Sequence, residues 1–295
     1  MPQFSPAVND YLLSILLGVL EGLTEFLPVS STAHLRIAEA FSHIDLANGF
    51  WKMYSIVIQL GAIIALTAFF WRRILKFLRT FPGGESGNRT ILNHPLSLVA
   101  IAFIVTAVPA FFLTKLIGKN LESLHVMAWA LLVGGIVMWV VDSLFVRPRI
   151  ERMEKTTLPI AIWIGAVQIL SAVFPGTSRS MCTIAAGQVA GMSRAAALEF
   201  SFFLSIPTMF VATGYDLWKT VKPHAATEVI APLTMTPHLW VVLAIGFVAA
   251  FISAFGVVAW FLHWVRRHGF TPFAVYRILL GAALLVLLAR GVVGR

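Results

Sequence analysis

The chain has 295 residues, of which 59% are hydrophobic and only 12% are charged, and its mean hydropathy is +0.87. A soluble domain usually carries about 25% charged residues, so this composition excludes a soluble globular protein and indicates one that crosses a membrane several times. The net charge of +9 would suit nucleic acid, but basic loops beside lipid headgroups explain it better in a membrane chain. We therefore expect a membrane, and no nucleic acid, as a partner.

Neither a disulfide nor a cleaved leader is expected. Cys182 is the single cysteine, which excludes an internal disulfide, and it is expected to be a small buried residue. No Lys or Arg precedes Arg36, whereas a secretory signal peptide begins with a positively charged segment.

Hydropathy predicts six membrane-spanning helices and two shorter helical pairs. The six spans cover about 51–71, 96–117, 124–146, 199–218, 238–262 and 273–290. Residues 11–48 and 158–198 are apolar segments broken by polar residues and proline, so each is expected to form a re-entrant helical hairpin that enters and leaves on one side. Residues 79–95 are expected to form a polar loop that is too short to be a domain.

The first of these hairpins contains a dense polar stretch, Glu21-Gly-Leu-Thr-Glu-Phe-Leu-Pro-Val-Ser-Ser-Thr-Ala-His34. Ionisable groups at membrane depth are costly and tend to be functional. Glu21 and Glu25 are four residues apart, so they share one face of a helix. Pro28 is expected to end that helix, and the hydroxyl residues after it, Ser30, Ser31 and Thr32, to start a new one. The free N–H groups of the new helix would form an anion site.

A second copy of this pattern lies 147 residues further on. Gly18 aligns with Gly165, Glu21 with Gln168, Pro28 with Pro175 and Ser31 with Ser178. The first copy brings two acids and a histidine, and the second brings Arg179 among hydroxyl residues. Two complementary half-sites in a duplicated chain predict one site where the copies meet. We expect an all-α polytopic fold with an inverted-topology repeat, as a single membrane domain over residues 1–295 with repeats at about 11–146 and 158–290.

Positive charge gives an expected orientation. Three spans separate the two hairpins, so the hairpins should open on opposite sides. The side opposite the N-terminus would hold eleven basic residues, namely Arg72, Arg73, Lys76, Arg79, Arg89, Arg147, Arg149, Arg152, Lys155, Arg266 and Arg267. The N-terminal side would hold six, namely Lys115, Lys119, Lys219, Lys222, Arg290 and Arg295. The positive-inside rule then places both termini and the mouth of the first hairpin outside the cytoplasm.

The polar residues of the second copy suit a phosphate or pyrophosphate. The planar fork of Arg179 matches phosphate oxygens, and Gly176 would let the backbone approach a ligand closely. Further donors would come from hydroxyl groups, those of Thr177, Ser178 and Ser180. The alternative is structural: the hydroxyl residues cap helices and Arg179 pairs with Glu21 or Glu25.

The residues of the first copy leave several roles open. Glu21 and Glu25 could hold a hard divalent ion such as Mg²⁺ or Ca²⁺, with a substrate phosphate completing its coordination. They could instead be a general acid and base, or a structural pair. His34 lies three residues after Ser31, so it could be a general base or acid for that serine, or only a packing residue. Of the remaining polar residues in or near the spans, Gln59 is expected to hydrogen-bond within the bundle, and Arg36, Glu199 and Arg277 to pair structurally or lie at the membrane edge.

At these residues the chain closely resembles the undecaprenyl-pyrophosphate phosphatase family, the integral membrane type linked to bacitracin resistance. The resemblance covers nearly the whole chain. It rests on the stretch from Glu21 to His34, on Pro175-Gly-Thr-Ser-Arg-Ser180 followed by Thr183, and on Ile58-Gln-Leu-Gly-Ala62.

The resemblance implies hydrolysis of the lipid carrier pyrophosphate to the monophosphate, which recycles the carrier for cell-wall synthesis. It also implies a divalent metal and a site open to the periplasm of a bacterial inner membrane. The family's acidic motif falls on Glu21 and Glu25, its histidine on His34, and its arginine motif on Ser178 and Arg179.

Two rival functions remain from the sequence. In a phosphatase, Ser31 or an activated water would attack the terminal phosphorus, with Arg179 stabilising the developing charge. In a transporter, the same inverted repeat would flip a polyprenyl phosphate lipid. The acids and His34 favour the enzyme, because binding alone would not need them. A polyprenyl pyrophosphate is the expected substrate. A homodimer is the one protein assembly that the sequence leaves open.

Overall fold

The structure, a computed structural model, describes residues 10–42, 44, 49–84, 87, 89–114, 116–117, 123–221 and 235–292. Over these residues the protein is all-helical, with ten α-helices, one 3₁₀ turn and no β-strand. The helices are α1 (Asp10–Thr24), α2 (Ser31–Phe41), α3 (Gly49–Thr80), α4 (Pro95–Phe112), α6 (Leu124–Leu144), α7 (Leu158–Val173), α8 (Arg179–Val189), α9 (Arg194–Val221), α10 (Pro237–Val265) and α11 (Thr271–Ala289), and the 3₁₀ turn η1 covers Met153–Lys155.

Six of these helices are long and apolar enough to cross a membrane, and they are the six predicted ones: α3, α4, α6, α9, α10 and α11. The main difference is in α3, which continues to Thr80 instead of ending near residue 71. Its last turns alternate basic residues with apolar ones at helical spacing, and Phe77 packs into the main core. The helix therefore extends beyond its apolar part because one face of the extension is buried.

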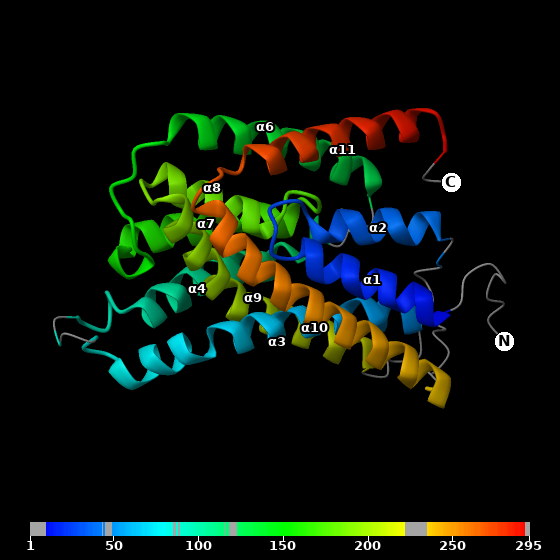
Figure 1. Cartoon of the computed structure of the whole chain (residues 1–295), viewed down its shortest axis with the longest axis horizontal. Coiled ribbons are helices and arrows are strands. Elements are labelled where there is room, and N and C mark those ends of the chain that lie inside the picture. Colours follow the sequence, from blue (N-terminus) through cyan, green and yellow to red (C-terminus); the bar gives the residue numbers. More distant parts are fainter. Residues whose placement is uncertain are drawn as a thin grey trace.

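Two pairs of shorter helices lie among the spans. The pair α1 and α2 (blue) lies toward the end of the bundle where α1 begins and α11 (red) ends (Figure 1). The pair α7 and α8 (green) lies toward the opposite end (Figure 1). Each pair is broken where the sequence predicts it, since α1 ends before Pro28 and α7 ends before Pro175.

Both breaks have the same unusual backbone conformation. Ser30 has φ of 74° and Ser178 has φ of 72°, and they are the two non-glycine residues with positive φ in the described part of the chain. Each immediately precedes a helix of 11 residues. A left-handed backbone conformation costs free energy for a residue with a side chain. The surrounding structure must therefore hold both serines in this conformation.

This pairing corrects the sequence alignment by one residue. An offset of 147 residues pairs Ser31 with Ser178, but the residue that shares the conformation of Ser178 is Ser30, 148 residues earlier. Between its proline and the following helix, the second break has three residues where the first has two, and one of the three is Gly176, with φ of 93°. A side chain at Gly176 would also collide with the backbone of Met127, 2.7 Å from the position of a Cβ.

Close backbone contacts fix the first helix of each pair. A Cβ at Gly18 of α1 would lie 2.4 Å from the carbonyl oxygen of Gly246 in α10. Likewise, a Cβ at Gly165 of α7 would lie 2.4 Å from the carbonyl oxygen of Ala102 in α4. Small residues at such crossings let membrane helices approach closely. Gly18 and Gly165, which the sequence aligns, thus make the same kind of close backbone contact.

Candidate active site

A cavity of about 510 Å³ lies where the two breaks meet α4 and α9. One part of its wall is polar and comes from both breaks, with Glu25, Ser30, Ser31, Thr32, Gly176, Ser178 and Arg179. Another part is apolar and comes from α4 and α9, with Phe103, Ala107, Ala110, Phe111, Met209 and Val211. The cavity therefore joins a polar pocket to an apolar surface, which suits a ligand with a charged head and a hydrocarbon tail.

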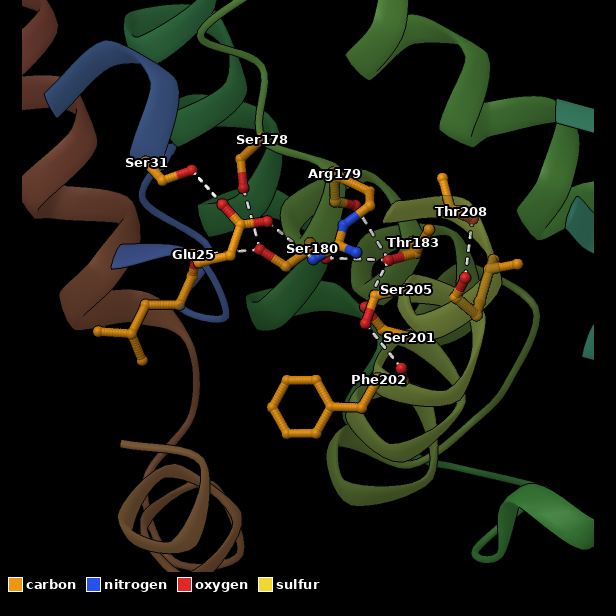
Figure 2. Close-up of polar contacts among 12 residues, drawn as sticks. Glu25, Ser31, Ser178, Arg179, Ser180, Thr183, Ser201, Phe202, Ser205 and Thr208 are labelled. Carbon is orange, nitrogen blue, oxygen red and sulfur yellow. Dashed lines mark hydrogen bonds and ion pairs between the residues drawn. The ribbon is translucent and has the colours of Figure 1, made fainter. Parts of the chain in front are cut away.

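Glu25 is the centre of the polar contacts (Figure 2). The hydroxyl of Ser31 donates a hydrogen bond to Oε2 of Glu25. The other carboxylate oxygen, Oε1, accepts a bond of 3.3 Å from Nη2 of Arg179. The side chains of Glu25 and Arg179 are only 10% and 14% exposed, so this ion pair is largely shielded from solvent. One carboxylate thus connects a nucleophile candidate in the first break to a cation in the second.

The guanidinium of Arg179 has unused hydrogen-bonding capacity. Its Nε and Nη1 atoms are buried and have no hydrogen-bond partner in the structure. Buried polar groups are nearly always paired, so unpaired donors need an explanation. The N–H groups of a guanidinium are strong donors to the oxygens of a phosphate. Arg179 thus keeps two nitrogen donors, Nε and Nη1, that no described residue uses.

The six hydroxyl and glycine residues predicted to bind pyrophosphate fall into two sets. Ser30, Thr32, Gly176 and Ser178 line the cavity. Thr177 and Ser180 do not line it, because each hydroxyl bonds a backbone carbonyl instead. Thr177 donates to Phe174 O over 2.7 Å, and Ser180 donates to Leu27 O over 2.9 Å. The bond from Ser180 joins the second break to the first, so the hydroxyl of Ser180 has a structural role.

His34 is placed beside Ser31 in sequence but bonds elsewhere. Its Nδ1 lies 2.7 Å from the carbonyl oxygen of Ser30, which can only accept, so Nδ1 carries a proton. Its Nε2 lies 2.6 Å from the hydroxyl of Tyr276 in α11. The hydrogen bonds of His34 thus do not include Ser31, and the titratable side chain in contact with Ser31 is that of Glu25.

Glu21 is a buried carboxylate beside the polar cluster. Its side chain is fully buried and neither carboxylate oxygen has a hydrogen-bond partner in the structure. It lies in α1, four residues before Glu25, which directly follows the helix, and it is not among the residues that line the cavity. The described residues contain no group of three His, Cys, Asp or Glu side chains placed to hold a metal ion. Two carboxylates do fit Mg²⁺, which often takes one or two protein carboxylates and completes its shell with water and substrate phosphates.

Sequence reasoning missed several residues at the site. Gln59, assigned only a bond within the bundle, lines the cavity, and so does Thr208. Gln168, the counterpart of Glu21, donates to Thr208 over 3.2 Å and leaves its buried Oε1 without a partner.

The charged residues outside the cavity had expected structural roles. Arg36 and Glu199 do form ion pairs, with Glu39 and Arg73 respectively. Arg277 was expected to pair or to lie at the membrane edge, but it is fully buried and bonds backbone carbonyls.

Comparison with known proteins finds relatives over most of the chain. The family model described as "Bacitracin resistance protein BacA" matches residues 14–283. An undecaprenyl-diphosphatase from Koribacter versatilis (strain Ellin345) is 63% identical over 280 residues, covering 94% of this chain and 98% of the relative. One from Rhizobium leguminosarum bv. trifolii is 41% identical over 97% of this chain and its own full length, and one from Caldanaerobacter subterraneus subsp. tengcongensis is 41% identical over 95% and 97%.

The six apolar helices define an integral membrane protein, and its cavity has one polar wall and one apolar wall. The match over most of its length shows that the chain belongs to the BacA family of bacitracin resistance proteins. The family resemblance inferred from the two polar motifs is therefore confirmed.

Proposed function

We propose that this protein hydrolyses undecaprenyl pyrophosphate to undecaprenyl phosphate and inorganic phosphate, which returns the lipid carrier to cell-wall synthesis. Its relatives carry the name of this activity. The observation that carries the proposal is the cluster of Ser31, Glu25 and Arg179, in which Arg179 keeps two unpaired N–H groups at a cavity with an apolar wall.

In the proposed first step, Oγ of Ser31 attacks the terminal phosphorus and Glu25 accepts the hydroxyl proton. The bond from that phosphorus to the bridging oxygen breaks, and undecaprenyl phosphate leaves with the bonding electrons. Water then attacks the phosphoserine, releasing inorganic phosphate and restoring Ser31. The unpaired N–H groups of Arg179 would bind the oxygens of the transferring phosphoryl group, where negative charge must be stabilised. A water molecule held by Ser31 and Glu25 could replace the serine as the nucleophile.

The roles of the remaining candidates follow from their positions. The backbone at the start of α2 and α8, with Ser30, Thr32, Gly176 and Ser178, would bind the phosphate oxygens. Thr177 and Ser180 would support the backbone around them. His34 would hold the start of α2 through Ser30, or exchange a proton if Tyr276 releases its Nε2.

A divalent cation, Mg²⁺ or Ca²⁺, would be held by Glu21 and Glu25. When bound, it would supply positive charge next to the pyrophosphate. The two unpartnered oxygens of Glu21 support this role, and so does the preference of Mg²⁺ for few protein ligands. Glu25 would then have to exchange part of its bonding to Arg179 or Ser31 for the cation.

We further propose that α1–α2 and α7–α8 are re-entrant hairpins of an inverted repeat, with the repeats at about 11–146 and 158–290 in one membrane domain. The shared conformation of Ser30 and Ser178 supports this, and so do the matching contacts of Gly18 and Gly165. Such repeats bring two broken helices together near the middle of the bilayer.

The proposed location is the bacterial inner membrane, with the site and both termini on the periplasmic side. Arg72, Arg73, Lys76, Arg152 and Arg266, all on the proposed cytoplasmic side, line one cavity of about 730 Å³. Some residues behind the charge count, including Lys119, Lys222 and both termini, lie outside the described residues. Cysteines introduced into a Cys182→Ala protein test the orientation: one near Arg290 should react with an impermeant thiol reagent on spheroplasts, and one near Arg79 should not. The reverse pattern would overturn it.

The experiment for the activity is phosphate release from a C55 isoprenyl pyrophosphate by the purified protein in detergent, with and without a chelator. We expect release that the chelator abolishes and added Mg²⁺ or Ca²⁺ restores. A protein that releases no phosphate but moves polyprenyl phosphate between the leaflets of vesicles would instead be the transporter.

A homodimer is a further proposal, and cross-linking in the membrane tests it.

A further inference from the structure

Arg277 is a buried cation with no acidic partner. It lies in α11, its side chain is fully buried, and no carboxylate in the described part of the chain pairs with it. Its guanidinium donates to three backbone carbonyl oxygens: Pro28 over 3.2 Å, Gly176 over 3.1 Å and Ala130 over 3.0 Å. A charge buried in the membrane without a counter-charge is expensive, so its position calls for a reason beyond packing.

Two of the three acceptors are equivalent positions of the two breaks. Pro28 lies two residues before Ser30, and Gly176 lies two residues before Ser178, the pair of serines with positive φ. Arg277 is the one side chain in the described part of the chain that is seen to bond the carbonyls of both breaks. It therefore contacts the same point of each half-site.

The surrounding helices make room for this guanidinium. α6 and α11 lie side by side (Figure 1). A Cβ at Gly134 of α6 would lie only 2.4 Å from Nη2 of Arg277. Any larger residue at position 134 would push the guanidinium away from the breaks. The packing of α6 on α11 thus fixes where the guanidinium sits, as well as which carbonyls it meets.

We propose that Arg277 is a positioning residue that holds the two helix breaks at a fixed separation. Ser31 follows Pro28 by three residues, and Arg179 follows Gly176 by three residues. One guanidinium bonded to both carbonyls therefore sets the distance between the nucleophile candidate of one half and the phosphate-binding cation of the other. This inference rests on the proposed function for its catalytic consequence, but its geometric content stands apart from any activity.

Two substitutions separate the hydrogen-bonding role from the charge. Arg277→Lys keeps the positive charge and loses the planar fork that reaches several carbonyls at once. Arg277→Gln removes the charge and keeps a neutral N–H donor. Arg73→Lys is the control, because Arg73 is another partly buried arginine of a membrane helix that binds two groups at once, Glu154 and Glu199, but lies away from the breaks.

The first readout is kinetic. We expect Arg277→Lys to lower kcat about 100-fold, since a misplacement of about 1 Å can have that effect, with a much smaller change in KM. Arg277→Gln should be similarly impaired, and Arg73→Lys should retain its rate. Wild-type kcat in Arg277→Lys would overturn the proposal, because the charge alone would then suffice.

The second readout is the distance between the breaks. Leu23 and Phe174 flank them, and both are exposed, at 42% and 45%. In a Cys182→Ala protein, spin labels at cysteines in these two positions should give a narrow distance distribution. Arg277→Lys and Arg277→Gln should broaden or shift it, and Arg73→Lys should not. An unchanged distribution in both Arg277 variants would overturn the proposal even if kcat falls.

These measurements also distinguish two kinds of failure. If the wild-type protein releases no phosphate from the C55 pyrophosphate, the proposed function fails, while the spin-label distances still test the positioning role. If phosphate is released but the distances do not respond to Arg277, the positioning role alone fails. Because Arg277→Lys retains the buried charge, it also guards against a general loss of folding in Arg277→Gln.

Discussion

The carboxylate of Glu25 lies 3.3 Å from the guanidinium of Arg179, although the two residues are 154 positions apart in the chain. The same carboxylate accepts the hydroxyl of Ser31. Ser31 and Arg179 therefore contact one carboxylate from opposite sides, which keeps them within roughly 8 Å of each other at hydrogen-bond distances. A single phosphoryl group can contact both, as the joint site requires.

Glu25 should be needed for chemistry more than for binding. Glu25→Gln keeps an oxygen that can accept from Ser31 but cannot take its proton, so we expect kcat to fall about 100-fold or more. Binding of the lipid pyrophosphate should persist. Glu39→Gln is the control, because Glu39 is a buried carboxylate that pairs with Arg36 and Ser55 instead. Glu25→Gln with the kcat of the wild type would exclude Glu25 as the base.

Glu21 should act through the divalent ion. Glu21→Gln removes a carboxylate whose two oxygens have no hydrogen-bond partner among the described residues. We expect the Mg²⁺ concentration for half-maximal phosphate release to rise about tenfold or more, since a carboxylate is a preferred ligand of this ion. Titration of activity with Mg²⁺ measures this. A lower rate with an unchanged metal dependence would instead assign Glu21 to proton transfer.

The bond between His34 and Tyr276 offers a test of how His34 works. Tyr276→Phe removes the hydroxyl that meets Nε2 and leaves the bond from Nδ1 to Ser30 intact. If His34 acts by holding the start of α2, this variant should lose less than about tenfold in kcat, whereas His34→Ala should lose more. Equal losses in both variants would show that Nε2 and its partner are the functional part.

Acid should weaken the end of the bundle that carries η1. Burial alone would raise the pKa of Glu154, but its hydrogen bonds and the charge of Arg73 outweigh burial and hold that pKa below its usual range. A lowered pKa adds stability above the unfolded value near 4.5, and this stability is lost as pH falls through the folded pKa. Glu154→Gln should therefore lower the thermal midpoint at pH 7 and change it little at pH 3. The exposed neighbour Glu151, changed to Gln, should show no such difference.

Much of the fold follows from the sequence because its signals are local. Apolar stretches of sufficient length predict all six spans, and Pro28 and Pro175 predict where the short helices break. Pairing across the chain is harder to predict. Glu25 and Arg179 could be matched only because the two polar motifs looked like halves of one site.

The misses have physical reasons. The side chain that meets Nε2 of His34 is Tyr276 in α11, which lies 242 residues away, so spacing along the first motif could not reveal it. The one-residue difference between the two breaks shows in the positive φ of Ser30 and Ser178, and a backbone angle has no signature in composition. Arg277 did leave a signal: it is an arginine in the first half of an apolar span, where an unpaired charge usually has a function.

The most direct test of the joint site is a double-mutant cycle on Ser31 and Arg179. kcat/KM for phosphate release from the C55 pyrophosphate would be measured for the wild type, Ser31→Ala, Arg179→Lys and the double variant. Arg179→Lys keeps the charge but loses the bidentate fork, and Ser31→Ala loses the nucleophile candidate. Parts of one catalytic unit are not additive, so the double variant should be about as active as the weaker single variant. Losses that multiply would contradict a single site built from both halves.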